Sequence, residues 1–156
     1  VGDWNIRVTT VDSAVFNKFP SVALLMSKTY APLGDIPKSI LMNRLVSASL
    51  VNKNMVLFDF KKIKSSDDSV IIHAISESGH SPNVSNAPVE HLVKDVKAIW
   101  GVQHIMEVAK VVKDENVSFM IPDDLRSVKV VSKADPNLEY YSMVIDSPKY
   151  AHFFED

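Results

Sequence analysis

Residues 88–113 read PVEHLVKDVKAIWGVQHIMEVAKVVK. Apolar residues recur there every three or four positions, and polar residues fall on the opposite side, a spacing that favours an amphipathic helix. The second half of the stretch is apolar nearly all round, which favours burial against a sheet. Gly101 interrupts the pattern at a cost of about 1 kcal/mol relative to alanine, so we expect a slight bend there. The sequence thus predicts one long buried helix over residues 88–113.

The segments around this stretch predict strands joined by short turns. Residues 55–63 and 69–76 are expected to form a hairpin, because turn-forming residues separate them. Residues 125–131 and 138–145 are expected to pair in the same way across Ala134-Asp135-Pro136-Asn137. The other expected elements are strands at 4–9 and 117–121, helices over 13–30 (broken at Pro20) and after Asp35-Ile36-Pro37, a connection at 31–34 and a mobile loop at 77–87.

These elements indicate an α+β fold, with a mainly antiparallel sheet packed against three to four helices. The 22 valines support the strand content, because a branched Cβ fits a pleated surface. A chain of 156 residues is long enough for one compact core and short for two. We therefore expect a single globular domain over residues 1–156, of which residues 147–156 form an aromatic C-terminal tail.

Composition argues against several classes of protein. The net charge of −2 disfavours a protein that grips nucleic acid over a broad face, since such proteins are usually basic. The absence of cysteine excludes disulfides, thiolate catalysis and sulfur-ligated zinc. No apolar run approaches the roughly 20 residues of a membrane-spanning helix, and the first residues lack the pattern of a signal peptide. We expect an intracellular protein on the cytoplasmic side, neither secreted nor transmembrane, and the triplets at Asn83 and Asn116 leave glycosylation undecided.

No spacing of reactive side chains points to catalysis. The four glycines stand singly, so no phosphate-binding loop can be drawn. The five histidines lack the spacing of a zinc site, and the paired aspartates at 67–68 and 123–124 are typical of solvated turns. We expect no enzyme, catalytic residue, cofactor, metal or small-molecule substrate. The alternative is an enzyme with an unfamiliar site near His80 and His91.

Two features suggest binding surfaces instead. Lys61, Lys62 and Lys64 lie near the tip of the expected hairpin beside apolar residues, where they are expected to contact an anionic membrane or nucleic-acid phosphates. The competing interpretation is a solvated strand edge on which lysines discourage pairing. The second feature is the C-terminal tail, whose aromatic residues should bury themselves on this domain or on another copy. The residues expected to mediate self-association are Tyr150, Phe153 and Phe154.

The first half of the chain resembles the core of rhabdovirus-type matrix proteins. The resemblance is carried by the alternating strand WNIRV at 4–8, a serine-containing helix entered through Val22-Ala23, the connection at Tyr30 and Gly34, and PKSIL at 37–41 opening a helix before a hairpin. It implies a peripheral protein of the virion that self-associates, contacts the inner membrane face and condenses the nucleocapsid. The basic, proline-rich arm of that family is missing, and this chain is slightly acidic.

These observations predict a non-enzymatic structural or interaction protein, a viral matrix-like assembly protein. Its expected partners are other copies of itself or another protein, with an anionic membrane surface or a ribonucleoprotein as further partners. The alternative is a small nucleic-acid-binding module that uses the lysine-rich hairpin tip.

Overall fold

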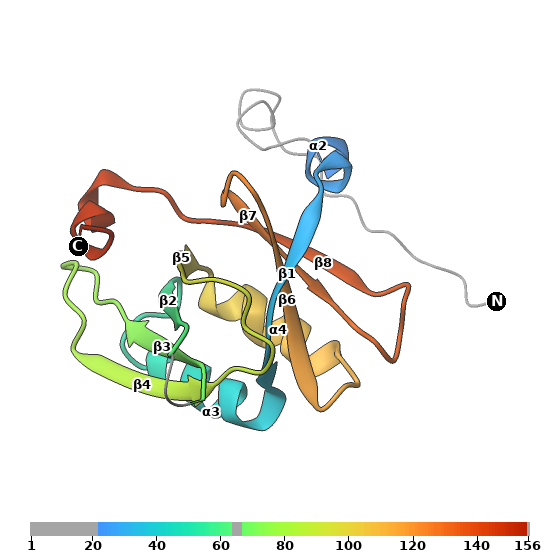
Figure 1. Cartoon of the computed structure of the whole chain (residues 1–156). Coiled ribbons are helices and arrows are strands. Elements are labelled where there is room, and N and C mark those ends of the chain that lie inside the picture. Colours follow the sequence, from blue (N-terminus) through green and yellow to red (C-terminus); the bar gives the residue numbers. More distant parts are fainter. Residues whose placement is uncertain (1–21, 64–66, 156) are drawn as a thin grey trace, which may run out of the picture.

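The computed structural model describes residues 22–63 and 67–155, which form two four-stranded antiparallel sheets with helices packed against them (Figure 1). The predicted α+β class is confirmed. The helices are α2 (Val22–Ser27), α3 (Lys38–Ser49), α4 (Val102–Val111) and the 3-10 helix η1 (Pro148–Phe153). The strands are β1 (Tyr30–Pro37), β2 (Val56–Lys61), β3 (Ser69–Ala74), β4 (Asn83–Pro88), β5 (Val96–Trp100), β6 (Asn116–Pro122), β7 (Ser127–Val131) and β8 (Glu139–Met143).

The two sheets meet along both of their edges. Sheet A has the strand order β1-β6-β7-β8, and sheet B has the order β4-β3-β2-β5. At one junction Asp35 of β1 and Glu90, just after β4, exchange two backbone hydrogen bonds of 2.8 and 2.9 Å. At the other, the Ile145 amide, just after β8, donates to the Ile99 carbonyl of β5 at 2.8 Å. The two sheets are thus held together by backbone hydrogen bonds as well as by a shared core.

Sheet B is buried on its inner face and, where β2 pairs with β5, on part of its outer face as well. Its inner face carries Phe58, Phe60 and Trp100, which share the main core with α3, α4 and the inner side chains of sheet A. Its outer face carries Leu57 and Ile99, which lie opposite each other in the β2–β5 register and form a second, smaller apolar cluster. Successive residues of β2 and of β5 therefore point alternately to the inner and the outer face, as the period of two in a strand requires.

Local sequence explains several elements that were predicted correctly. The hairpin of β2 and β3, the pairing of β7 with β8, and strand β6 all form as expected. Helix α3 buries Leu41, Leu45 and Ala48 along one side, at the spacing of helical turns. Strand 4–9 and the break at Pro20 lie outside the described residues, whereas α2 matches the second half of the helix predicted at 13–30.

The single long helix predicted over residues 88–113 is wrong. Strand β5 occupies Val96–Trp100, and helix α4 begins at Val102. The strand is covered on both faces, so its residues are apolar without alternation, and a run of this kind does not distinguish a strand from a buried helix. Gly101 is the boundary, with an extended backbone at the helix N-cap. A Cβ at Gly101 would lie 2.6 Å from the His104 ring, so glycine allows the close turn from strand to helix.

Two segments predicted to be irregular are strands. Residues 31–34 belong to β1, an edge strand, where Pro32 is tolerated and a register shift separates it from Gly34. A Cβ at Gly34 would lie 2.6 Å from Val89 Cγ1, so glycine permits this close approach. The second half of the loop predicted at 77–87 forms β4, the edge strand of sheet B. Strand β4 has a single buried residue, Ala87, so its apolar pattern is weak, whereas the buried residues 33–36 of β1 include Gly34 and Asp35, which are uncommon in strands.

The last residues form a segment that crosses the outer face of sheet B, and we call residues 144–155 the strap. The strap leaves β8, contains η1, and ends beside the loop between β3 and β4 (Figure 1). Tyr150 is buried in the outer cluster with Leu57, Ile75 and Ile99. His152 Nε2 lies 3.0 Å from the Gly79 carbonyl oxygen, and the Lys149 ammonium donates to the Glu77 carbonyl. The strap therefore ties sheet A to the far end of sheet B.

Candidate functional site: a groove where the sheets meet

A groove of about 500 Å³ lies where the end of sheet A meets the outer face of sheet B. Three segments far apart in sequence form it: β5, the β6–β7 turn, and the chain from the end of β8 into the strap. Most of its apolar lining comes from the last two segments. The lining residues are Lys97, Asp124, Leu125, Arg126, Met143, Val144, Ile145, Asp146 and Phe154.

The β6–β7 turn is held rigidly at one wall of the groove. The Leu125 amide donates to the Pro122 carbonyl at 3.1 Å, and the Arg126 amide donates to Asp124 Oδ1 at 3.1 Å. Leu125 has a φ of +53°, in the left-handed region that favours glycine, yet its side chain remains 39% exposed. Leucine in this conformation is strained, and such strain is typical of functional positions. The turn thus presents an apolar side chain at the groove.

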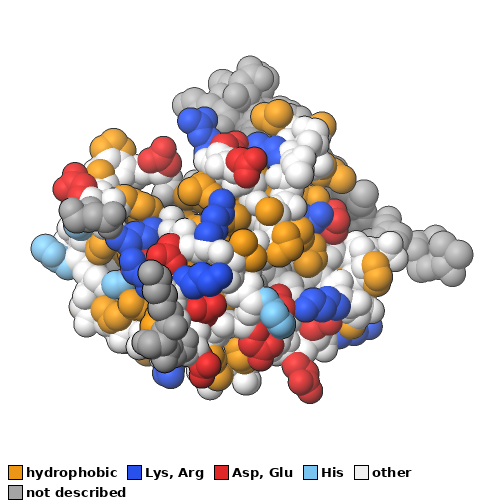
Figure 2. All heavy atoms as spheres, in the orientation of Figure 1, with side chains coloured by type: hydrophobic (Ala, Val, Ile, Leu, Met, Phe, Trp, Pro, Cys, Tyr) orange, Lys and Arg blue, Asp and Glu red, His pale blue; other side chains and the backbone are white. Residues whose placement is uncertain are grey.

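The charged groups at the groove rim include both signs. Lys28 Nζ lies 2.6 Å from Asp124 Oδ2, and this hydrogen bond, with the backbone donor of Arg126, lowers the pKa of Asp124. Asp124 is therefore anionic at neutral pH. Lys97 and Arg126 supply cations to the lining. Figure 2 shows acidic and basic side chains interspersed with hydrophobic ones on this view of the molecule, with no broad field of one charge. The rim is suited to a ligand with polar flanks and an apolar centre.

A shallower hollow continues the groove toward the β2–β3 hairpin. It shares Lys97, Leu125 and Phe154 with the groove and adds Lys61 from β2. Lys61 Nζ lies 3.5 Å from Asp59 Oδ1. Lys62 is exposed, its amide donates to Asp95 Oδ1 at 2.7 Å, and Lys64 lies outside the described residues. The structure thus places one of the three predicted contact lysines, Lys61, in the hollow beside the groove, and their contact with a membrane or nucleic acid stays a prediction.

The three tail aromatics predicted to mediate self-association have different surroundings. Tyr150 is buried, and Phe153 is half-buried against the same outer cluster. Phe154 is 43% exposed and lines the groove. In this single chain the tail packs on its own domain, and association between copies stays a prediction.

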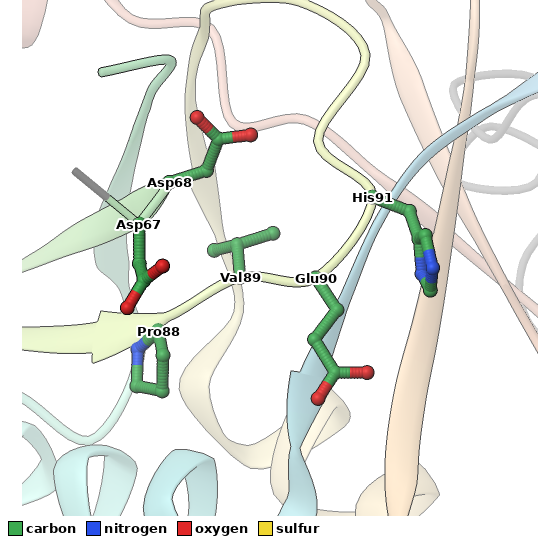
Figure 3. Close-up of a pocket in the computed structure, with 6 residues that line it drawn as sticks. All are labelled: Asp67, Asp68, Pro88, Val89, Glu90 and His91. Atoms are coloured by element: carbon green, nitrogen blue, oxygen red, sulfur yellow. The ribbon is translucent and has the colours of Figure 1, made fainter. Parts of the chain in front are cut away.

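The hollow near His91 does not gather groups for catalysis. It is lined by Asp67, Asp68, Glu90 and His91 together with Pro88 and Val89. Figure 3 shows the carboxylates of Asp67 and Asp68 pointing in opposite directions, while Glu90 and His91 point away from them. General acid–base catalysis requires groups that converge on one reacting atom. The residues drawn in Figure 3 do not converge on one point in this way.

His80 and His91 are also kept apart by the fold. His80 precedes β4 and His91 follows it, so a six-residue strand of roughly 20 Å separates them. His91 has a φ of +57° and its Nδ1 lies 3.5 Å from Asp35 Oδ2. Within the described ranges 22–63 and 67–155, no group of three or more His, Cys, Asp or Glu side chains is placed to hold a metal ion. The fold therefore does not bring His80 and His91 into one site, and an enzyme with a site near either of them stays an alternative.

Asp35, expected to precede a helix, lies buried in β1, where it accepts hydrogen bonds. Lys133 Nζ lies 2.9 Å from its Oδ2. Burial alone would raise the pKa of Asp35, but the hydrogen bonds from Lys133, Ser118 and His91 and the charge of Lys133 outweigh it, so the pKa lies below its ordinary value. The carboxylate joins β1 to the residues after β7 and is a structural group.

This pKa shift predicts a loss of stability in acid. A carboxyl whose pKa is lower in the folded state stabilises the fold above its unfolded pKa of 3.8, and that contribution disappears as the pH falls through the folded value. We expect the free energy of unfolding to fall less steeply between about pH 5 and pH 2 in Asp35→Asn than in the natural chain. Urea denaturation followed by circular dichroism at each pH measures this slope. Equal slopes in the two proteins would assign the acid sensitivity to other carboxyls.

The fold is similar to that of bacterial DNA polymerase sliding clamps. The β subunit of DNA polymerase III from Pseudomonas aeruginosa matches with a TM-score of 0.67 and 16% identity over 87% of this chain and 36% of that one. The sliding clamp from Caulobacter crescentus matches with a TM-score of 0.65 and 12% identity over 83% and 34%. A structure of the Pseudomonas aeruginosa clamp bound to griselimycin matches with a TM-score of 0.67 and 16% identity over 83% and 34%. The chain therefore spans about a third of the clamp chains that it matches.

No protein-family model and no curated protein matches the sequence. The resemblance to rhabdovirus matrix proteins is wrong, because the structural similarity is to sliding clamps, and the virion and matrix-protein expectations fall with it. The helices at 22–27 and 38–49 and the hairpin after them form as expected, but the connection predicted at residues 31–34 is part of a strand, and residues 4–8 lie outside the described part of the chain. Nothing in the comparison supports a membrane or a ribonucleoprotein as partner. No helix among the described residues has both the length and the apolar character to cross a bilayer.

The groove was missed by sequence reasoning. The predicted pairing of residues 125–131 with 138–145 already brings Leu125 near Ile145, but nothing in the sequence indicates that Lys97 and Phe154 will join them. One signal was present: Leu125 follows Pro122-Asp123-Asp124, a turn in which a large apolar residue is unusual.

Proposed function

We propose that this chain is a non-catalytic module of the sliding-clamp type, which acts by holding other macromolecules. The observation that carries this proposal is the match to DNA polymerase clamps over 87% of this chain with a TM-score of 0.67. Because the chain spans about a third of those proteins, a complete clamp would need further domains or further copies. Association of this chain with copies of itself or with another protein belongs to this proposal, as does the view that residues 1–156 form one domain.

The groove is the proposed docking site for partner proteins. Its apolar lining suits a short segment with one or two apolar anchors, and the mixed charges at its rim suit polar residues on either side. A partner protein docked in this way carries out its own activity, and this chain only holds the partner in place. The proposal therefore requires no reactive group here.

The helices are the proposed surface toward DNA. Although the chain is acidic overall, α3, α4 and the turns after them expose Lys53, Lys110 and Lys113, and α3 also carries Arg44. Glu107 is the acidic residue within these two helices, and Asp114 and Glu115 lie in the turn after α4. A protein that slides must hold DNA through weak contacts to phosphates and not through base contacts, and lysines on a helical layer provide such contacts.

Reversing two helix charges tests this function. We expect Lys110→Glu/Lys113→Glu to weaken binding to duplex DNA about tenfold or more, and to reduce the slope of log affinity against log salt by about two, because each phosphate contact contributes about 0.9. The natural chain should bind weakly, at about 10⁻⁴ M and without sequence preference. Fluorescence anisotropy of a labelled duplex between about 50 and 200 mM salt measures both quantities.

The matched control is Lys61→Glu/Lys62→Glu, which changes the same charge on the β2–β3 hairpin. The clamp proposal expects this variant to lose less affinity than the helix variant. A larger loss from the hairpin variant would instead support a nucleic-acid-binding module that uses the hairpin tip. Absence of any salt-dependent DNA binding by the natural chain would contradict both functions.

A further inference from the structure

The strap is held at its far end by the loop between β3 and β4, residues 75–82 (Figure 1). His152 Nε2 lies 3.0 Å from the Gly79 carbonyl oxygen, and the Lys149 ammonium donates to the Glu77 carbonyl. A Cβ at Gly79 would lie 3.7 Å from the His152 ring and 3.8 Å from the Lys149 carbonyl oxygen, so the strap packs against this turn. The attachment of the strap therefore depends on the position of the loop.

The side chain of His73 joins this loop to sheet B. In β3 it lies opposite Leu57 of β2 and Val84 of β4, and Leu57 belongs to the outer cluster that contains Tyr150. Its Nδ1 lies 3.4 Å from the hydroxyl oxygen of Ser81, near the end of the loop. Its Nε2 is buried and has no hydrogen-bond partner among the described residues. These surroundings suit a neutral ring, because only one ring nitrogen has a polar partner.

Protonation would give His73 a buried N–H group that nothing accepts. A charged histidine donates from both ring nitrogens, whereas only Nδ1 has a partner here. Burial lowers the pKa of His73 below its ordinary value of 6.5; the Asp59 carboxylate acts in the opposite direction, and Lys97 lowers the pKa further. The charged ring is therefore more stable in water than in this position.

The ionisable groups of the elements around His73 leave it as the group that must stay neutral. Strand β4 carries none, and the others are Asp59 and Lys61 on β2, Lys97 on β5, Glu77 and His80 in the loop, and Lys149 and His152 on the strap. Asp59 Oδ1 already lies 3.5 Å from Lys61 Nζ. His152 can donate from Nε2 to the Gly79 carbonyl whether its ring is neutral or charged, so its protonation preserves that contact.

We propose that His73 is a pH-sensitive switch for the strap: in mild acid its ring takes up a proton, moves toward water, leaves Ser81 and loosens the loop that holds the strap. A histidine with a lower pKa in the closed state than in the open state favours opening as the pH falls below about 6.5. The switch acts on the attachment of the strap and does not depend on what the groove binds. Because Ile145 and Asp146 of the strap line the groove, opening also changes the groove.

Hydrogen exchange of the full chain between about pH 7.5 and pH 5 tests the switch, after correction for the exchange rate of an unstructured peptide at each pH. The amides of Ile145 and Tyr150 donate to Ile99 and Ser147 and report on the strap. We expect their protection to fall about tenfold over this range, and by no more than about thirtyfold, the limit that an open-state pKa of 6.5 sets. Amides in α3 should keep their protection, because the main core stays closed.

Two variants and one titration assign the effect to His73. His73→Leu cannot take up a proton, so its strap protection should change less than about twofold over the same range. His80→Gln is the matched control, because His80 is exposed in the same loop, and it should keep the whole effect. In the natural chain, nuclear magnetic resonance of the ring protons should show His73 titrating below 6.5.

Three results would each overturn the switch. They are constant strap protection in the natural chain, an equal fall of protection in His73→Leu, and a His73 ring that titrates at or above 6.5. The titration needs no substitution, so it decides the matter even where His73→Leu does not fold. The proposed DNA-binding function would stand after any of these results, because none of them involves α3 or α4.

Discussion

Replacing Trp100 with alanine is expected to destabilise this protein by about 4 kcal/mol, a large share of the 5–15 kcal/mol that stabilises a typical domain. Trp100 is fully buried at the end of β5 and joins the two sheets. Its ring stacks on Phe119 of sheet A at 5.5 Å with an angle of 4°, and lies 4.8 Å from Phe58 of sheet B.

A matched pair of variants separates this packing from surface effects. Trp100→Phe keeps a ring between the sheets and removes the indole N–H, which is buried without a hydrogen-bond partner, so it should cost less than half as much. Leu50→Ala, at a position 85% exposed, should cost about 0.5 kcal/mol or less. Guanidinium denaturation followed by circular dichroism measures all three. A loss from Trp100→Ala as small as that from Leu50→Ala would contradict the shared core.

Replacing Tyr150 with alanine is expected to release the strap at a cost of about 3 kcal/mol. The substitution removes the buried ring that covers Leu57, Ile75 and Ile99, and these side chains then face water. Exchange of the Ile145 amide, which donates to Ile99, should become much faster, while amides in β2 and β3 stay protected. Hydrogen exchange with mass spectrometry locates the change, and Tyr150→Phe is the control expected to resemble the natural chain.

The same variant decides how the aromatic tail relates to self-association. If the strap packs on its own domain in solution, Tyr150→Ala exposes an apolar patch and should increase concentration-dependent association. If the tail aromatics join two copies, the same variant should reduce it. Sedimentation velocity over a range of concentrations distinguishes these results, and a decrease would favour exchange of straps between copies.

Sequence reasoning succeeded where the deciding signal was local. The β2–β3 hairpin is marked by polar turn residues between two apolar runs, and α3 by the spacing of Leu41, Leu45 and Ala48. It failed at β5, because the outer face of that strand is covered by a strap that begins more than forty residues later. Burial on both faces erased the alternation that identifies a strand. The apolar pattern indicates that these residues are buried, but only the fold shows which segment covers them.

The candidate site also combines features with a local signal in the sequence and contacts that depend on the fold. The predicted pairing of residues 125–131 with 138–145 places Leu125 near Ile145, but nothing in the sequence indicates that β5 adjoins them through the backbone hydrogen bond from Ile145 to Ile99. The lysines and tail aromatics were visible as unusual local composition, and Lys61 and Phe154 do lie at the groove or its extension. The sequence indicated that these residues are suited to binding, but it did not indicate that Lys61 and Phe154 lie close together, because that depends on how the two sheets meet.

The pairing of β1 with β6 has a consequence for biosynthesis. Asp35 lies opposite Ser118, a partner 83 residues further along the chain. Closing so long a loop is slow, and a ribosome must deliver most of the polypeptide before this strand finds its neighbour. Until then Leu33 and Ile36, fully enclosed in the finished molecule, remain accessible to chaperones and proteases. The nascent protein should therefore stay dependent on protection until translation has passed Pro122.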